Sequence, residues 1–265
     1  MKEFIQYFWN NQGFVYDSNI NYVLSPYHLT MMGLMAMAFI VLWVIGNHLK
    51  NRTRLLTVVS FALLVLEVLR VLNFHYAHQY SWFDSLSFHM CSIGVYLGII
   101  AGIFKKKILF DIMFIQAFIG GITAIVIPLG ILPWWNAFSF IPLQSNLSHM
   151  LMIFMLVYAV KSQIWQIKLK RYYIAVISFL ISAVGIHLLN LYKYRLNPSS
   201  YSNYFWTRFP DPQFPLINSL EFPYHIIIII GLALFFGLLS YLIGSAASKI
   251  SNNKYNQFNI NSTYD

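Results

Sequence analysis

The stretch LLTVVSFALLVLEVLRVLNF, residues 55–74, decides the fold class of this chain. It is 20 residues long and carries only two charges, those of Glu67 and Arg70. An α-helix needs about 20 predominantly apolar residues to cross the hydrocarbon core of a bilayer. Comparable apolar runs recur along the chain, and the predicted spans are 29–46, 55–74, 86–104, 108–129, 147–165, 172–190 and 224–244. We therefore predict an all-α, polytopic membrane helix bundle of about seven transmembrane helices.

The composition excludes a soluble domain. Of the 265 residues, 58% are hydrophobic and 9% are charged, whereas a soluble domain carries roughly 25% charged residues. The formal net charge is +9, but the Lys and Arg residues stand in small groups and build no recognition helix, so we expect no nucleic-acid partner. The single cysteine, Cys91, excludes an intramolecular disulfide and any CxxC metal motif.

The basic residues predict how the helices are oriented in the membrane. Most of them fall in alternate connections and in the C-terminal tail; these twelve are Lys50, Arg52, Arg54, Lys105, Lys106, Lys107, Lys161, Lys168, Lys170, Arg171, Lys249 and Lys254. Because cytoplasmic loops are enriched in Lys and Arg, the N-terminus should lie outside and the C-terminus in the cytoplasm. The predicted parts are an extracytoplasmic segment 1–28, a seven-helix transmembrane domain 29–244 and a cytoplasmic polar tail 245–265.

With this orientation, the polar residues inside the spans gather in the outer half of the bilayer. They are His28, Glu67, Arg70, His75, His89, Cys91, His149, His187 and Asn190. Glu67 and Arg70 are three positions apart, so they share one helix face and are predicted to form an ion pair in the bundle interior. Asp111, near the cytoplasmic end of its run, is interpreted as a snorkelling or capping residue.

Cys91 has two interpretations. A free cysteine is usually a small, packed, apolar side chain. However, His149 enters another helix at a similar depth on the same side, and an imidazole can take a thiol proton to give a nucleophilic thiolate. Matching depth is necessary for such a pair but does not establish it. The remaining histidines, including His78 and His225, are interpreted as interfacial or packed residues.

Five short landmarks occur in a fixed order along the chain. They are Ser25-Pro26-Tyr27-His28-Leu29, Leu86-Ser87-Phe88-His89-Met90-Cys91, Ser148-His149, Asn203-Tyr204-Phe205-Trp206 and Phe222-Pro223-Tyr224. In these landmarks the chain resembles the YwaF-type multipass membrane proteins and the eukaryotic transmembrane acyltransferases related to them. It differs in having Ser87-Phe88 where Pro-Leu is expected, and in a polar insertion over 191–202.

The resemblance implies a lipid acyltransferase of the cell membrane. The cysteine and histidine of the related enzymes correspond to Cys91 and His149, which are 58 positions apart. Cys91 would accept an acyl group from a phospholipid as a thioester, and His149 would serve as general base and then acid. The acceptor would be a lysophospholipid, or water in a hydrolase. Glu67, Arg70 and His28, with Asn203 and Tyr204, would bind substrate or support the site; no metal or cofactor is expected.

Two alternatives from other classes remain. A transporter or channel could use Glu67, Arg70 and the outer histidines to line a path for a small polar or charged solute, although no inverted repeat is visible. A zinc site could use His28, His149, His187 and Glu67, although no HExxH-like motif is present. A purely structural membrane protein is the remaining possibility.

Overall fold

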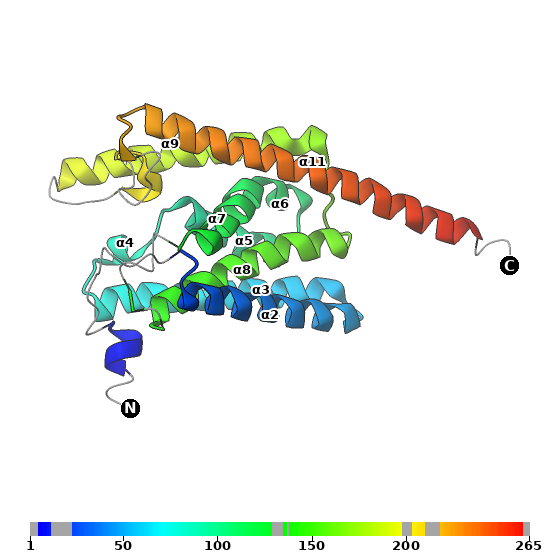
Figure 1. Cartoon of the computed structure of the whole chain (residues 1–265), viewed down its shortest axis with the longest axis horizontal. Coiled ribbons are helices and arrows are strands. Elements are labelled where there is room, and N and C mark those ends of the chain that lie inside the picture. The colour runs from blue at the N-terminus through cyan, green and yellow to red at the C-terminus, as the bar shows by residue number, and fades with distance from the viewer. Residues whose placement is uncertain are drawn as a thin grey trace.

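The fold is given by a computed structural model that describes residues 5–11, 23–128, 135–136, 138–197, 203–209 and 218–261. All regular secondary structure in these residues is helical (Figure 1). The helices are η1 (Ile5–Trp9), α2 (Pro26–His48), α3 (Arg52–Leu72), η2 (Asn73–Ala77), α4 (Trp82–Ser85), α5 (Met90–Phe104), α6 (Lys107–Phe114), η3 (Ile115–Ile119), α7 (Gly120–Val126), α8 (Phe140–Lys161), η6 (Leu169–Arg171), α9 (Tyr172–Leu196), η7 (Tyr204–Trp206) and α11 (Tyr224–Asn261).

Six helices in the described residues are long and apolar enough to cross a membrane. They are Pro26–His48, Arg52–Ala77, Lys107–Val126, Phe140–Lys161, Leu169–Leu196 and Tyr224–Ala246. The predicted all-α polytopic bundle is therefore confirmed. The third predicted span is shorter than expected, since α5 has 15 residues and is about 22 Å long at 1.5 Å per residue, against a hydrocarbon core of about 30 Å.

The ends of α5 explain its short length. The chain approaches it in an extended conformation through His89, with φ −63° and ψ 153°. It leaves the helix through Lys105, whose φ of 54° is left-handed and ends the helical hydrogen-bond pattern. The apolar run 86–104 therefore splits into an extended entrance and a helix, a division that hydropathy does not reveal.

Helix α8 is the central helix of the bundle. In its most apolar 18-residue window, 72% of the residues are buried, compared with 11% for α2 and for α11. Figure 1 shows α2 and α3 on one side, α8 between them and α5 to α7, and α9 with α11 on the other side. The connections between α2 and α3, α5 and α6, and α8 and α9 lie at one end of the bundle; together with the adjoining helix ends they carry ten of the 17 Lys and Arg residues.

Two predicted spans have wrong boundaries. Helix α8 begins at Phe140 instead of residue 147 and ends at Lys161 instead of residue 165. Helix α9 continues to Leu196, into the segment interpreted as a polar insertion. In both cases polar residues lie within a helix beyond its predicted apolar run. The last candidate span, Tyr224–Ala246, agrees with the predicted 224–244, and its helix continues to Asn261; residues 262–265 lie outside the described part.

The fourth run contains a π-helical turn. Helix α6 passes into η3 and then into α7, which begins at Gly120. At Gly120 and Gly121 a side chain would meet the neighbouring helices. A Cβ added at Gly120 would lie 3.6 Å from the Cα and Cβ atoms of Cys91. A Cβ added at Gly121 would lie 3.2 Å from Ile153 and 3.4 Å from the His149 carbonyl oxygen. The two glycines therefore allow α5 and α8 to approach α7 closely.

The interpretation of Asp111 as a snorkelling residue is wrong. Its side chain is fully buried. One carboxylate oxygen accepts hydrogen bonds from Trp165 Nε1 at 2.9 Å and from the Tyr241 hydroxyl at 3.2 Å, and the other forms an ion pair with Arg171 at 2.5 Å. Asp111 therefore joins α6, α11 and the connection between α8 and α9 at the basic end of the bundle.

Candidate functional site

The predicted ion pair of Glu67 and Arg70 is confirmed. Arg70 Nε donates to Glu67 Oε2 at 2.9 Å, and its Nη2 donates to Oε1 at 2.7 Å, with both side chains about nine-tenths buried. The Tyr96 hydroxyl on α5 lies 2.8 Å from Glu67 Oε1 and 2.9 Å from the Ser87 carbonyl oxygen. Both carboxylate oxygens are thus occupied, and the pair holds α3 against the entrance of α5.

Cys91 is the second residue of α5 and is half-buried. Its backbone packs against Gly120 at the start of α7. His89, at the N-cap, makes no side-chain capping bond, and the N–H groups of a helix's first turn have no partner within the helix. Arg70 also acts electrostatically on Cys91 and on His89. Burial of the thiol is the larger influence and opposes a negative charge on Cys91, whereas the helix N-terminus and the nearby guanidinium favour one.

His149 lies in the middle of α8, with its side chain almost fully buried. Its Nδ1 atom is 2.6 Å from the Ser145 carbonyl oxygen and 3.2 Å from the Ser145 hydroxyl oxygen. Because a carbonyl oxygen can only accept, Nδ1 must carry the proton, and Nε2 then holds a lone pair. In the described structure Nε2 is buried and has no hydrogen-bond partner. His149 Nε2 could therefore accept a proton or a hydrogen bond, as could His78 Nε2, His187 Nδ1 and His225 Nδ1, which are also buried there without a hydrogen bond.

Cys91 and His149 come from helices that meet at the same two glycines. Gly120 contacts the backbone of Cys91, and Gly121 contacts the carbonyl of His149. Helices α5 and α8 also pack directly against each other. The two residues named from the sequence therefore belong to one three-helix junction of α5, α7 and α8.

The entrance of α5 also meets the landmark Asn203-Tyr204-Phe205-Trp206. The Phe205 N–H donates to His89 Nδ1 at 3.3 Å, and the rings of Tyr204 and Trp206 lie 5.3 and 5.9 Å from the His89 ring. Phe205 and Trp206 have left-handed φ values of 56° and 50°. Such a conformation is costly for aromatic residues. The contact with His89 helps to hold this turn, so two landmarks distant in sequence form one structure.

Asn203 and Tyr204 have structural partners. The Asn203 side chain accepts from the N–H groups of Arg208 and Phe209 and donates to the Phe209 carbonyl, all at 2.8–3.2 Å. The Tyr204 hydroxyl receives a hydrogen bond from Lys193 Nζ at 3.0 Å. These contacts shape the outer loop beside His89, and they already engage the Asn203 amide that would otherwise donate to substrate.

Lys193 connects this loop to α4. Its ammonium forms an ion pair with Asp84 at 2.5 Å and lies 4.9 Å from the centres of the Phe83 and Tyr204 rings. The hydrogen bond from Lys193, with a second from the Ser81 hydroxyl, lowers the pKa of the Asp84 carboxyl. The cation is thus fully engaged in holding α4, α9 and the loop together.

His28 holds the first helix in position. The Leu24 N–H donates to its Nδ1 at 3.0 Å, and its Nε2 donates to the carbonyl oxygen of Ile125, at the end of α7, at 2.7 Å. Both ring nitrogens are therefore used. This argues against the zinc alternative, since His28 has no lone pair left and Glu67 is bound to Arg70; the described residues hold no group of three potential metal ligands.

The polar first half of α8 was not predicted from the sequence. Gln144, Ser145, Asn146 and Ser148 are all buried. Gln144 Nε2 donates to the Ser148 hydroxyl at 3.2 Å, and Asn146 Nδ2 donates to the Pro142 carbonyl oxygen at 2.8 Å. The signal available in the sequence was the i,i+4 spacing of Ser145 and His149, which puts them on one helix face.

Taken together, these features define a polytopic α-helical membrane protein with a buried polar site at the junction of α5, α7 and α8. The model of the TMEM164 family matches residues 23–241, which is most of the 265-residue chain. The chain therefore belongs to the TMEM164 family. Comparison with curated proteins and with solved structures gave no match to either.

Proposed function

We propose that this protein is an integral membrane lipid acyltransferase of the cell membrane. It would move a fatty acyl chain from a phospholipid to a lysophospholipid through an acyl-cysteine intermediate on Cys91. The observation that carries the proposal is the state of the His149 ring, whose Nδ1 is fixed by Ser145 and whose Nε2 is buried without a partner. A buried, oriented imidazole with a free lone pair has a chemical use as a base.

In the first half-reaction, His149 Nε2 takes the proton from the Cys91 thiol. The thiolate attacks the ester carbonyl carbon of the phospholipid, and the carbonyl π electrons move onto oxygen. Collapse of this intermediate forms the thioester and breaks the bond to the glycerol oxygen. The imidazolium returns its proton to that oxygen, and a lysophospholipid leaves.

The second half-reaction reverses these roles. The hydroxyl of an acceptor lysophospholipid gives its proton to His149 and attacks the thioester carbonyl. The thiolate of Cys91 then leaves and regains the proton. The oxyanion in both steps needs hydrogen-bond donors; the backbone N–H groups of Cys91 and Ser92 in the first turn of α5 and the Arg70 guanidinium are the candidates. One ester forms as another breaks, so the exchange itself needs no further reactant.

The transporter alternative requires Glu67 and Arg70 to face a solute path. Their mutual hydrogen bonds and the contact with Tyr96 occupy both Glu67 oxygens and two Arg70 nitrogens. A solute would have to break this pair to bind. The geometry therefore favours a supporting role for the pair over a transport path.

Mass spectrometry of the intact protein tests the proposal. The purified protein is incubated with phospholipid vesicles, and an acyl adduct is expected on the peptide that contains Cys91. Hydroxylamine should remove the adduct, since it cleaves thioesters, and Cys91→Ser should prevent it. Folded wild-type protein that never acquires an acyl group from any of a panel of phospholipids would refute the enzyme assignment.

A further inference from the structure

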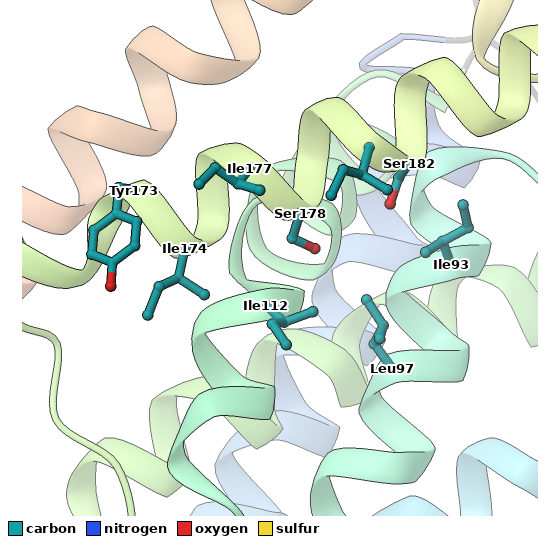
Figure 2. A pocket seen from close by; sticks show the side chains of 9 residues that line it. Ile93, Leu97, Ile112, Tyr173, Ile174, Ile177, Ser178 and Ser182 are labelled. Atoms are coloured by element: carbon teal, nitrogen blue, oxygen red, sulfur yellow. The ribbon is translucent and has the colours of Figure 1, made fainter.

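A groove runs along the outside of the bundle between α5, α6 and α9 (Figure 2). Its volume is about 460 Å³. It is lined by Ile93, Leu97, Ile112, Tyr173, Ile174, Ile177, Ser178, Ile181 and Ser182. Tyr173, Ile177 and Ile181 are more than half exposed, so the groove is open to the surrounding lipid.

Large side chains line the sides of the groove, and small side chains line its base, or floor. Ser178 and Ser182 are one turn apart on α9, and their short side chains leave the hollow between the isoleucines of the three helices. Gln116 fixes the floor from behind, since its Nε2 donates to the Ser178 hydroxyl at 3.0 Å while its side chain is fully buried. The polar hydrogen bond thus joins η3 to α9 and holds the hollow open.

The lining indicates what the groove accepts. Helices that pack against each other in membranes approach through stripes of small residues. Six of the nine lining side chains here are Ile or Leu, and they would keep the backbone of a second helix away. A single hydrocarbon chain is narrower and can enter between them. From Tyr173 to Ser182 the groove follows α9 for about 14 Å at 1.5 Å per residue, which suits an extended chain.

The groove and Cys91 lie on different sides of the same helix. Ile93 follows Cys91 by two residues, and at about 100° per residue the two side chains project roughly 200° apart. Both are close to the N-terminus of α5, since the helix begins at Met90. A molecule seated over this helix end could therefore send one chain down each side of α5.

We propose that the groove binds the acyl chain of a two-chain phospholipid donor that is not transferred, while the chain to be transferred lies on the Cys91 side of α5. The identity of the lipid as donor rests on the proposed function; binding of a chain in the groove does not. The arrangement makes α5 a wedge between the two chains of one lipid. It selects donors with two chains over donors with one.

Photolabelling tests the binding step. The protein in detergent is given a trace of phosphatidylcholine with a diazirine on the retained chain, irradiated and mapped by peptide mass spectrometry. Label is expected on the α5, α6 and α9 peptides that line the groove, and excess unlabelled phosphatidylcholine should remove it. Ser182→Phe fills the floor and should reduce groove label at least 5-fold. Val184→Phe, on the same helix and 60% exposed outside the groove, is the matched control and should retain it.

Transfer kinetics test the role of the chain. Ser182→Phe should raise KM for a two-chain donor at least 10-fold, and should change KM for a lysophospholipid donor less than 2-fold. An equal change in KM for both donors would overturn the inference. In the photolabelling experiment, label spread evenly over the exposed faces of α2 and α11 would overturn it too. If the wild-type protein proves to be dimeric in detergent, and Ser182→Phe makes it monomeric without any groove label being seen, the inference would be overturned in favour of a packing surface for a second copy. Groove label without an acyl-cysteine would reject the proposed function and leave the chain site standing.

Discussion

Two buried polar clusters of the bundle differ in how completely they are bonded. At the basic end, Asp111 has partners on both oxygens from Trp165, Tyr241 and Arg171, and these contacts join several helices. In the middle of α8, His149 is anchored through Nδ1 alone, and its Nε2 lies buried without a hydrogen bond in the described structure. The hydrogen bonds of His149 and of its polar neighbours stay within α8.

This difference separates structural from chemical roles. An unsatisfied buried polar atom costs free energy comparable to a lost hydrogen bond, so a stabilising cluster should contain none. Asp111 comes close to that requirement, since Oδ1 accepts two hydrogen bonds and Oδ2, which has no hydrogen bond, is paired with the Arg171 guanidinium. The His149 ring does not, and under the proposed function its free nitrogen would take the proton of Cys91, which lies on an adjoining helix.

The largest expected effect is on activity at the Cys91 end. Cys91→Ser should remove acyl transfer, and His149→Ala should lower its rate by roughly 10²- to 10⁴-fold, the usual contribution of a positioned general base. Neither change should lower the free energy of unfolding by much more than about 1 kcal/mol, because no buried hydrogen bond between side chains of different helices is lost. Acyl transfer per folded protein is the measurement. A His149→Ala protein that keeps the wild-type turnover would contradict the role of His149 as the general base.

At the Asp111 end we expect the reverse pattern. Asp111→Asn leaves Arg171 without its ion-pair partner and should lower the free energy of unfolding by roughly 3–5 kcal/mol, as breaking a buried pair does. Turnover of the protein that remains folded should stay near that of the wild type. Chemical denaturation in mixed micelles measures the loss, and adding Arg171→Met should recover part of it. If Asp111→Asn folds normally but is inactive, the roles of the two clusters were assigned the wrong way round.

The Glu67–Arg70 pair lies near Cys91 but is bonded like the Asp111 cluster. Glu67→Gln and Arg70→Met should each cost more stability than the double variant, with a coupling free energy of about 0.5–3 kcal/mol. A double-mutant cycle in detergent gives this number. Tyr96→Phe removes one hydrogen bond to Glu67 and should cost about 1 kcal/mol. Additive losses would mean that the two charges do not stabilise each other.

Most of the spans could be predicted from the sequence because an apolar run of about 20 residues is long enough to cross a bilayer as a helix. The start of α8 at Phe140 could not be predicted, because Gln144, Ser145 and Asn146 look like a loop until the packing that buries them is known. The short length of α5 could not be predicted either, because the apolar run continues before Met90 while the chain there is extended and not helical. Hydropathy measures the preference for lipid and not the backbone conformation.

Within the candidate site, one ion pair could be predicted from the sequence, and the neighbourhood of the helices could not. The Glu67–Arg70 pair followed from i,i+3 spacing alone, because both partners lie on one helix. The prediction for Asp111 failed because its partners come from distant segments, up to Tyr241. The junction at Gly120 and Gly121 required knowledge of which helices are neighbours, and that information is not contained in any one helix.

The smallest expected effect concerns Ser145, which touches His149 Nδ1 in two ways. The carbonyl oxygen at 2.6 Å survives any substitution, whereas the hydroxyl at 3.2 Å is lost in Ser145→Ala. The carbonyl alone fixes the tautomer, so the base should still work. The hydroxyl adds stabilisation when the ring is protonated, and its loss should lower kcat about 5-fold, or roughly 1 kcal/mol, the net value of one hydrogen bond.

The Ser145 substitution distinguishes a chemical contact from a structural one. If the hydroxyl stabilises the imidazolium, Ser145→Ala should lower kcat with little change in KM or in stability, and Ser145→Thr should restore the rate because it returns a hydroxyl to the same position. Ser148→Ala is the matched control, since Ser148 is a buried serine of the same helix bonded to Gln144. If both alanine variants lose equal stability and neither changes kcat per folded molecule, the Ser145 hydroxyl only packs the helix, and the carbonyl alone must hold the base.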